Sequence, residues 1–348
     1  MSEHHSAEHH SADPQRRAFL RAVASAAALG TLSLPTLAPL QVFAKEMEMV
    51  VKGPPVPDIP AKKLGKHTYV VIAPDGFPNP KNQGMMSNIT FVVTQKGVVI
   101  LDSGASVQIG EMALRQIRKV TDKPVIAVFN THYHGDHWLG NHAFVEAYKD
   151  IPIYAHPLTT SAIKTGQGEF WQHLMERSTD NATLGTIVTP PNKDIKHGDV
   201  FNYGDVTIRC HHYGKAHTPA DVCFEIVEDR IVHVGDVAME RRIAFMEDGS
   251  YLGTFKTMDE LQKIKPKLWL PGHGQPGPDV LKNNRELFEG IYGACVEAIK
   301  QGKPLEEAKS MVLVDPRVKK WASQTKGFNE NIGNYTSLAY TEAEQANF

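Results

Sequence analysis

The stretch Thr131-His-Tyr-His-Gly-Asp-His-Trp138 constrains this chain more than any other, because it holds three histidines and an aspartate in the pattern His-x-His-x-Asp-His. It follows residues 124–129, a short apolar and β-branched run that is typical of a buried strand. Imidazole and carboxylate groups suit zinc or iron, and the cluster contains no cysteine that would favour softer metals. The pattern therefore predicts a metal site in the turn that follows a strand.

Three later segments carry further ligand-type side chains, each close to the end of a predicted strand. They are Gly214-Lys-Ala-His-Thr-Pro219, the pair Gly235-Asp236, and Pro271-Gly-His-Gly274. Together with the first stretch they resemble, in order and spacing, the signature of the metallo-β-lactamase-fold hydrolases, and the similarity extends from about Lys66 to about Gly274. The resemblance implies an α/β fold of four layers, the αββα sandwich of that family.

The resemblance also implies how metals are held and what the site does. His132, His134 and His217 would bind a first zinc ion, Asp136, His137 and His273 would bind a second, and Asp236 would bridge the two. The implied activity is that of a dinuclear zinc-dependent hydrolase, in which a metal-bridging hydroxide attacks the carbonyl bond of a thioester, an ester or a lactam. Asp136 would also take part in catalysis, by orienting the water and carrying a proton to the leaving atom.

Two other activities remain open on the same fold, a mononuclear iron persulfide dioxygenase and a β-lactamase proper. The best-known zinc β-lactamases carry a cysteine where this chain has Asp236 and a non-ligand where it has His137, so the site is nearer to thioester and ester hydrolases such as glyoxalase II. The runs Gly76-Phe-Pro-Asn-Pro80 and Phe328-Asn-Glu-Asn-Ile-Gly-Asn-Tyr335 are similar to exported metallohydrolases associated with bacterial sulfur-oxidation and quinoprotein gene clusters. The substrates of that branch are poorly defined, so this similarity does not indicate a substrate.

Some residues are candidates for a supporting role around the metals. Asp102 ends the apolar run 98–101 and could hold a ligand histidine from behind, although an aspartate at a strand end is equally often a helix cap. In the family, a loop at the place of residues 74–86 overhangs the metal site. Its Phe77, Met85 and Met86 would then contact substrate, or would simply pack on the surface. The sequence identifies no other substrate-binding residue.

Strand-like and helix-like segments alternate along the chain in two similar halves. Strands are expected at 67–73, 88–94, 98–102, 124–129 and 151–156, and again at 199–202, 205–212, 221–227, 231–235 and 267–270. Helices are expected at 108–120, from about 141, and at 158–180, 251–264, 280–301 and 305–312. The alternation favours two packed sheets with helices outside them.

We divide the chain into a signal peptide (1–44), an extended lead-in (45–65), a catalytic domain (66–279) and a helical C-terminal extension packed on it (280–348). Because only a short Pro/Gly turn follows His273, the extension is expected to cap the site rather than form a separate domain. Trp321, Phe328 and Tyr335 would lie near the pocket mouth or at a subunit contact, or would complete a core.

Composition and the first residues bear on partners and location. The chain has 37 basic and 39 acidic residues, so no overall field would attract nucleic acid or an anionic membrane, and a small-molecule substrate is expected. Arg16-Arg-Ala-Phe-Leu-Arg21, followed by an uncharged run at 22–40, resembles a twin-arginine signal and predicts a periplasmic protein without stable membrane insertion after cleavage. A homo-oligomer is compatible with the sequence. Cys210 and Cys223 either pair or act as small buried apolar residues.

Overall fold

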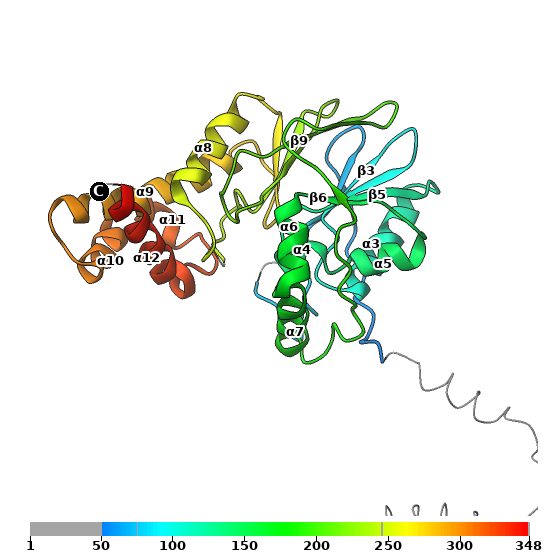
Figure 1. Cartoon of the computed structure of the whole chain (residues 1–348), viewed down its shortest axis with the longest axis horizontal. Helices are drawn as coiled ribbons and strands as arrows, with labels where there is room; N and C mark the ends of the chain where they lie inside the picture. The colour runs from blue at the N-terminus through cyan, green and yellow to red at the C-terminus, as the bar shows by residue number, and fades with distance from the viewer. Residues whose placement is uncertain (1–50, 75, 245, 347–348) are drawn as a thin grey trace, which may run out of the picture. The chain divides into compact units, whose positions relative to one another are not determined.

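The computed structural model describes residues 51–74, 76–244 and 246–346 (Figure 1). The predicted twin-arginine signal at 1–44 and the start of the lead-in lie outside the described residues, so export stays a prediction. Residues 51–61 contain no helix or strand, and the first strand follows directly at β1 (Lys62–Lys63). No helix within the described residues is long and apolar enough to cross a membrane.

The first sheet has seven strands in chain order. They are β1, β2 (Thr68–Val71), β3 (Ile89–Val93), β4 (Val98–Leu101), β5 (Val125–Phe129), β6 (Ile153–Ala155) and β7 (Lys193–Asp194). The pairings up to β3–β4 are antiparallel, and those from β4–β5 onward are parallel. The carboxyl ends of β4 and β5 are therefore neighbours at one edge, where the His-rich stretch begins.

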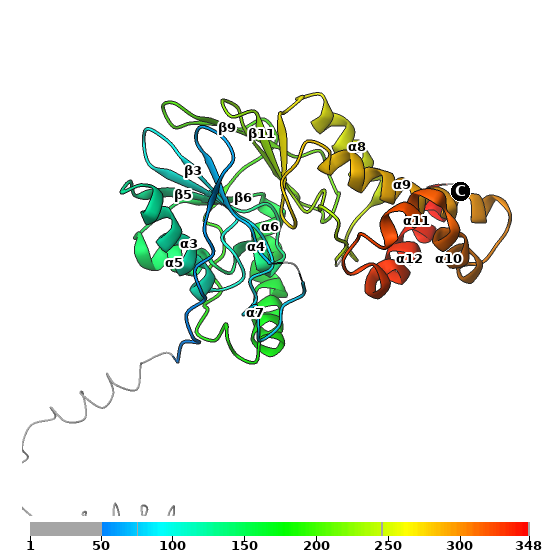
Figure 2. The same cartoon turned by 180° about the vertical axis from the view of Figure 1, so that it is seen from behind.

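The second sheet has five strands in the order β12-β11-β10-β9-β8. They are β8 (Val200–Asn202), β9 (Thr207–His211), β10 (Cys223–Ile226), β11 (Ile231–Gly235) and β12 (Leu268–Pro271). Two of them, β9 and β11, are labelled in Figure 2. Only β11 and β12 pair in parallel, so their carboxyl ends also lie side by side. The segments after these two strands carry the aspartate and the last histidine of the motif.

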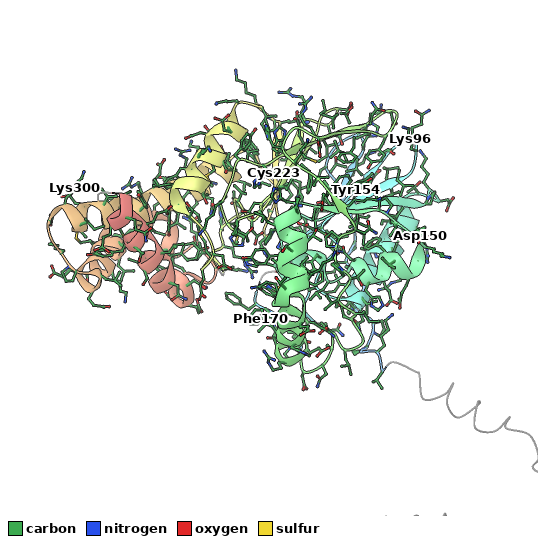
Figure 3. The ribbon with its side chains drawn as sticks, in the orientation of Figure 1. Lys96, Asp150, Tyr154, Phe170, Cys223 and Lys300 are labelled. Atoms are coloured by element: carbon green, nitrogen blue, oxygen red, sulfur yellow. The ribbon has the colours of Figure 1, made fainter. Side chains whose placement is uncertain are left out.

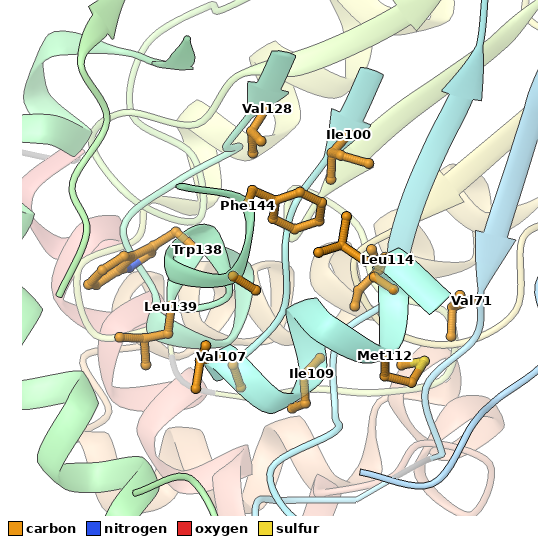
Figure 4. Packing of buried hydrophobic residues seen from close by; sticks show 14 of the residues in the cluster. Val71, Ile100, Val107, Ile109, Met112, Leu114, Val128, Trp138, Leu139 and Phe144 are labelled. Carbon is orange, nitrogen blue, oxygen red and sulfur yellow. The ribbon is translucent and has the colours of Figure 1, made fainter. Parts of the chain in front are cut away.

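Alternating apolar side chains build a core on each face of the first sheet. In β4, Val99 and Leu101 belong to the core between the two sheets, together with Phe224 and Ile231 of the second sheet. Ile100 lies on the opposite face, among the helix residues shown in Figure 4. Burial of one such aliphatic side chain stabilises the fold by about 1.5–3 kcal/mol.

Helices cover the outer face of both sheets. The first sheet packs against α3 (Val107–Val120) and α5 (Asn141–Ala147), and the second packs against α8 (Tyr251–Gln262) through Met258 and Leu261. The order of layers is helix, sheet, sheet, helix. The predicted four-layer αββα sandwich is therefore confirmed.

The helix predicted at 158–180 is not continuous. The structure has α6 (Pro157–Ala162), a π-helical turn (Ile163–Gln167) and α7 (Gly168–Ser178). The backbone leaves helical geometry at Thr165 and at Gly166, where φ is 127°. Glycine adopts this conformation without the steric penalty that a side chain would add. The break sets α7 on its own axis.

The C-terminal region consists of α9 (Val280–Lys300), α10 (Leu305–Val314), α11 (Pro316–Ala322) and α12 (Phe328–Ala346). A core of these helices buries Trp321, Phe328 and Tyr335. Of the placements considered for these aromatic residues, the structure therefore supports the one in which they complete a core. The same core includes Tyr251 of α8, whose hydroxyl donates a hydrogen bond to the Tyr335 carbonyl at 3.1 Å. The helices are thereby joined to the segment that follows β11.

The cysteines do not form a disulfide. Cys210 on β9 belongs to the core between the sheets, whereas Cys223 on β10 belongs to the core beneath α8. The two side chains lie on opposite faces of one sheet. Both act as buried apolar residues, and burial raises the pKa of the Cys210 thiol to about 12.

Candidate metal centre

The seven predicted ligands come from the ends of four strands. The segment after β5, with the short helix α4 (Gly135–Trp138), provides His132, His134, Asp136 and His137; the segments after β9, β11 and β12 provide His217, Asp236 and His273. Four therefore come from the first sheet and three from the second. All seven are buried, and the most exposed, Asp236, is only 7% accessible.

These side chains converge in two groups. His132, His134, His217 and Asp236 form one group, and Asp136, His137 and His273 form the other; within each group the ligand atoms lie within 4.8 Å of one another. The division matches the two sets predicted from the sequence. Their role as metal ligands stays a prediction.

Asp236 lies between the two groups. Its Oδ2 atom is 3.6 Å from His217 Nε2 and 3.2 Å from His273 Nε2, and its Oδ1 atom is 3.5 Å from His137 Nε2. The carboxylate thus reaches both groups with its two oxygens. This is the place that the bridging role predicts.

The donor atoms themselves fit a metal. Four buried atoms that face the cluster make no hydrogen bond, namely His132 Nε2, Asp136 Oδ2, His137 Nε2 and Asp236 Oδ1. Buried polar atoms are normally paired, because leaving one unpaired costs free energy. Imidazole nitrogens and carboxylate oxygens at this spacing are the ligands of zinc and iron centres. A cation among them would satisfy all four atoms.

Asp102 fixes the tautomers of two of these rings. Its Oδ2 atom accepts hydrogen bonds from His137 Nδ1 at 2.8 Å and from the Thr131 hydroxyl at 3.0 Å. Since the Thr131 proton is committed to Asp102, its oxygen accepts from His132 Nδ1 at 2.9 Å. Both rings therefore keep a proton on Nδ1 and turn Nε2 toward the cluster, so that Nε2 is the nitrogen available to a metal.

The alternative role of Asp102 as a helix cap is not observed. The side chain that caps α3 is that of Ser106, which accepts a hydrogen bond from the Ile109 amide. Asp102 is fully buried, and its backbone has φ of 57°. Burial would raise its pKa, but His137 and His233 outweigh that effect and lower it.

His233, which the motifs did not mark as a site residue, is also part of this network. Its Nε2 atom is 3.2 Å from Asp102 Oδ2, and its Nδ1 atom is 3.2 Å from the Leu270 carbonyl oxygen. It joins β11 to the ends of β4 and β12. The only signal in the sequence was a histidine within an otherwise apolar strand, three residues before Asp236.

The last histidine is held in a similar way by the backbone. His273 Nδ1 donates a hydrogen bond to the Met86 carbonyl at 2.7 Å, which leaves Nε2 directed at the cluster. Gly272 makes this approach feasible, because a Cβ atom there would collide with Asp236 Oδ1 and lie 2.7 Å from His137 Cε1. Only glycine fits beside two ligands at once.

The electrostatics of the cluster favour a cation. Burial would raise the pKa values of Asp136 and Asp236, but His137 and His273 hold both well below the ordinary range. In turn, burial would lower the pKa of His137, yet the surrounding carboxylates raise it well above its usual value. His132 shifts the other way, because burial and the neighbouring histidines lower its pKa. Ionised carboxylates thus hold protons on nearby rings, and a bound metal would displace those protons.

A cavity of about 320 Å³ opens over both groups. Its floor includes His134, Asp136, Asp236 and His273, and its walls are Phe77, Pro78, Met86, Trp171, Leu174, Ser178, Ala244 and Asn331. Phe77 and Met86 of the loop 74–86 therefore lie where the sequence placed them as substrate contacts. Met85 does not, because it is buried in the core of the first sheet.

The other wall residues were not predicted. Trp171 and Leu174 come from α7, and Asn331 comes from α12. The C-terminal extension thus reaches the cavity through an asparagine rather than through the aromatic residues. Nothing in the local sequence marks these positions, since Trp171 and Leu174 belong to an ordinary helical pattern and Asn331 lies beyond the last predicted helix.

The sequence model described as the Metallo-beta-lactamase superfamily matches residues 82–273, which include every predicted ligand. The chain belongs to the metallo-β-lactamase superfamily. This confirms the family predicted from the motifs. The association with sulfur-oxidation gene clusters is not tested by this match.

Three characterised relatives illustrate the range of the superfamily. The chain is 24% identical over 263 residues to a linear primary-alkylsulfatase of a Pseudomonas species, covering 64% of this chain and 49% of the relative. It is 25% identical over 210 residues to an atrochrysone carboxyl ACP thioesterase of Aspergillus chevalieri (60% and 56%). It is 24% identical over 256 residues to a type 2 metallo-beta-lactamase of a Bacillus species (72% and 89%). The chain spans about half the length of the first two relatives.

Solved structures share the fold. A metallo-beta-lactamase from Pontibacter korlensis superposes with a TM-score of 0.51 at 18% identity, covering 64% of this chain and 94% of that one. The DIM-1 metallo-beta-lactamase gives 0.50 at 17% identity, with coverage of 66% and 96%. At these identities the similarity supports the fold alone. About a third of this chain lies outside each superposition.

Proposed function

We propose that this protein is a hydrolase that holds two zinc ions and cleaves the carbonyl bond of a thioester, an ester or a lactam. The observation that carries the proposal is the arrangement of seven buried ligands in two groups, with Asp236 between them. The relatives support a hydrolase, since they are named as a sulfatase, a thioesterase and a β-lactamase. A small-molecule substrate fits the cavity.

In the proposal, His132, His134 and His217 hold one ion, Asp136, His137 and His273 hold the other, and Asp236 contacts both. What a bound zinc pair supplies is Lewis acidity, which lowers the pKa of coordinated water toward neutrality and polarises the bond under attack. The chain's own contribution is geometric. Asp102, Thr131 and the Met86 carbonyl hold three rings with the correct nitrogen forward.

Asp136 is the residue to which we assign proton transfer. It faces the cavity, and its Oδ2 atom lies 3.2 Å from His273 Nε2 and 3.3 Å from His137 Nε2. Its backbone carbonyl accepts a hydrogen bond from the Ser87 hydroxyl, which fixes the turn. A carboxylate held there can take a proton from water and deliver it to a leaving atom above the floor.

The test combines metal analysis with a hydrolysis panel. Purified protein should contain two zinc ions per chain and cleave at least one of three substrates: a thioester, a carboxylic ester or a β-lactam. Cleavage of an alkyl sulfate alone would contradict the assignment of a carbonyl bond. Asp236→Ala should lower occupancy at both positions and cost more than the roughly 10–100-fold typical of losing an outer partner. Asp259→Ala is the matched control, because that aspartate is 57% exposed on α8.

Two outcomes would contradict the proposal. Full two-metal content in Asp236→Ala would show that this carboxylate does not bridge. One iron per chain, with oxygen uptake on a persulfide, would instead support the dioxygenase. The dioxygenase has less support, because it would not use all of the second group, and that group is complete in this chain.

A further inference from the structure

One wall of the cavity is an apolar face of α7. Trp171, Leu174 and Ser178 are spaced by three and four residues, so they lie on the same side of the helix. The Trp171 ring lies 4.9 Å from the His134 ring, and its Cβ atom packs so closely on Gly135 that a side chain there would collide. The wall therefore begins directly at the metal ligands.

A second part of the wall is Phe77, Pro78 and Met86, and Arg242 holds it at Gly76 and Phe77. The Arg242 guanidinium donates a hydrogen bond to the Gly76 carbonyl at 2.8 Å and lies 5.2 Å from the centre of the Phe77 ring. Arg242 itself is only 2% exposed and does not line the cavity. It is a structural cation behind the wall, so it is not placed to pair with a substrate anion.

The walls carry no charge. Among the described residues that line the cavity there is no lysine or arginine, and apart from the predicted ligands only Ser178 and Asn331 are polar. Both are neutral. A carboxylate on a substrate that extended along these walls would lose its water without gaining a partner, which strongly disfavours binding.

From this geometry we infer that the substrate, beyond the group that is cleaved, is an uncharged apolar acyl or alkyl chain of a few carbons lying between α7 and Phe77. The inference rests on the proposed function and names its substrate class. The volume of about 320 Å³ is at the small end of the roughly 300–1,000 Å³ of small-molecule sites. A short chain fills it, whereas a bulky ring system that carries a carboxylate does not suit its walls.

A binding series tests the inference without requiring turnover. Hydroxamates of acetic, butyric and hexanoic acid anchor at the metal site of the zinc-loaded full chain and differ only in the tail, and calorimetry gives their Kd values. Each added methylene should lower Kd about fourfold, the fold-change for about 0.8 kcal/mol per buried CH₂. The monohydroxamate of adipic acid has the same length as hexanoyl but ends in a carboxylate. It should bind at least about tenfold more weakly than hexanohydroxamate.

Two variants of α7 test whether the tail of the hydroxamate lies against this helix. Leu174→Lys adds a cation to the wall and should shift the preference toward the adipic compound at least about tenfold. Phe170→Lys makes the same change on the same helix outside the cavity, at a residue that is 49% exposed (Figure 3), and should leave the preference unchanged. Equal shifts in both variants would overturn the assigned wall.

The series also separates this inference from the proposed function. Equal affinities along the series, or tighter binding of the adipic compound to the unmodified protein, would overturn the inference even if a thioester or lactam is hydrolysed. If the tail preference holds but no substrate of the panel is cleaved, the proposed function fails and the assignment of the pocket stands.

Discussion

The floor of the cavity and its walls are built in different ways. Every predicted ligand of the floor is at most 7% exposed, and the second nitrogen of His132, His137 and His273 is held by a hydrogen bond from behind. The walls come from a loop, α7 and α12, which are outside both sheets, and Phe77 is 43% exposed. The sandwich thus sets the chemistry, and the parts attached to it set which molecule reaches that chemistry.

The largest effect is expected from a change beneath the floor of the cavity. Asp102→Asn would present an amide to His137 Nδ1 and remove the acceptor that orients Thr131. Metal affinity should fall by about 10–100-fold at both positions, because rings of both groups lose their fixed tautomer. Competition with a chromogenic chelator measures the affinity.

Asp229→Asn is the control for this change. Asp229 accepts hydrogen bonds from the amides of Lys66, His67 and Thr68, and it is not among the predicted metal ligands. Its replacement should lower the melting temperature without changing zinc affinity. If Asp102→Asn also changed only the melting temperature, Asp102 would be a structural residue and not a support for the ligands.

A second change tests how closely the floor is packed. Gly272→Ala places a methyl group against the Asp236 carboxylate and the His137 ring, so both must move. Zinc affinity should fall by about tenfold or more, comparable to the loss of an outer hydrogen bond. Gly277→Ala, a few residues later, meets only Val280 Cγ2 at 3.7 Å and should bind zinc normally. Equal affinities in the two variants would show that the turn yields easily.

A change in the wall should have the smallest effect, and it should alter KM rather than zinc affinity. Arg242→Met removes the hydrogen bond to Gly76 and should destabilise the protein by about 1–3 kcal/mol. With Phe77 less firmly held, KM should rise severalfold while zinc content stays at the level of the unmodified protein.

The neighbouring Arg241 provides the control. Its side chain is 56% exposed and pairs with Glu240 at the surface, so Arg241→Met should alter neither KM nor zinc content. A loss of zinc in Arg242→Met would show that the floor and the walls of the cavity do not act independently.

The same division explains what the sequence could predict. The seven predicted ligands could be proposed because their motifs resemble those of the superfamily, and each follows a predicted strand end, where side chains distant in sequence can converge. Asp102 was identified because it ends a predicted strand, although its role was left open. The walls could not be found in this way, because Trp171 and Asn331 come to line one cavity only through the relative placement of α7 and α12.

A second feature that the sequence could not predict is which side chains of a helix face the cavity. The break at Gly166 sets the axis of α7. On this axis the Trp171 ring faces the His134 ring, whereas the neighbouring Phe170 side chain is exposed. The continuous helix predicted over 158–180 did not indicate which of Phe170 and Trp171 would face the metal site. In the C-terminal region, apolar periodicity predicted helices at 280–301 and 305–312 but not α12, whose Phe328 and Tyr335 enter a core while Asn331 lines the cavity.

Each ligand group takes side chains from both sheets, and this has a consequence for how the protein unfolds. An ion bound there would join the two halves of the sandwich at this edge and would act as a reversible cross-link. Its strength is set by the concentration of free metal rather than by a covalent bond. At a hundred times Kd, one such ion adds about 2.7 kcal/mol to the free energy of unfolding. Resistance to denaturation and to proteolysis would therefore follow the metal supply of the surroundings.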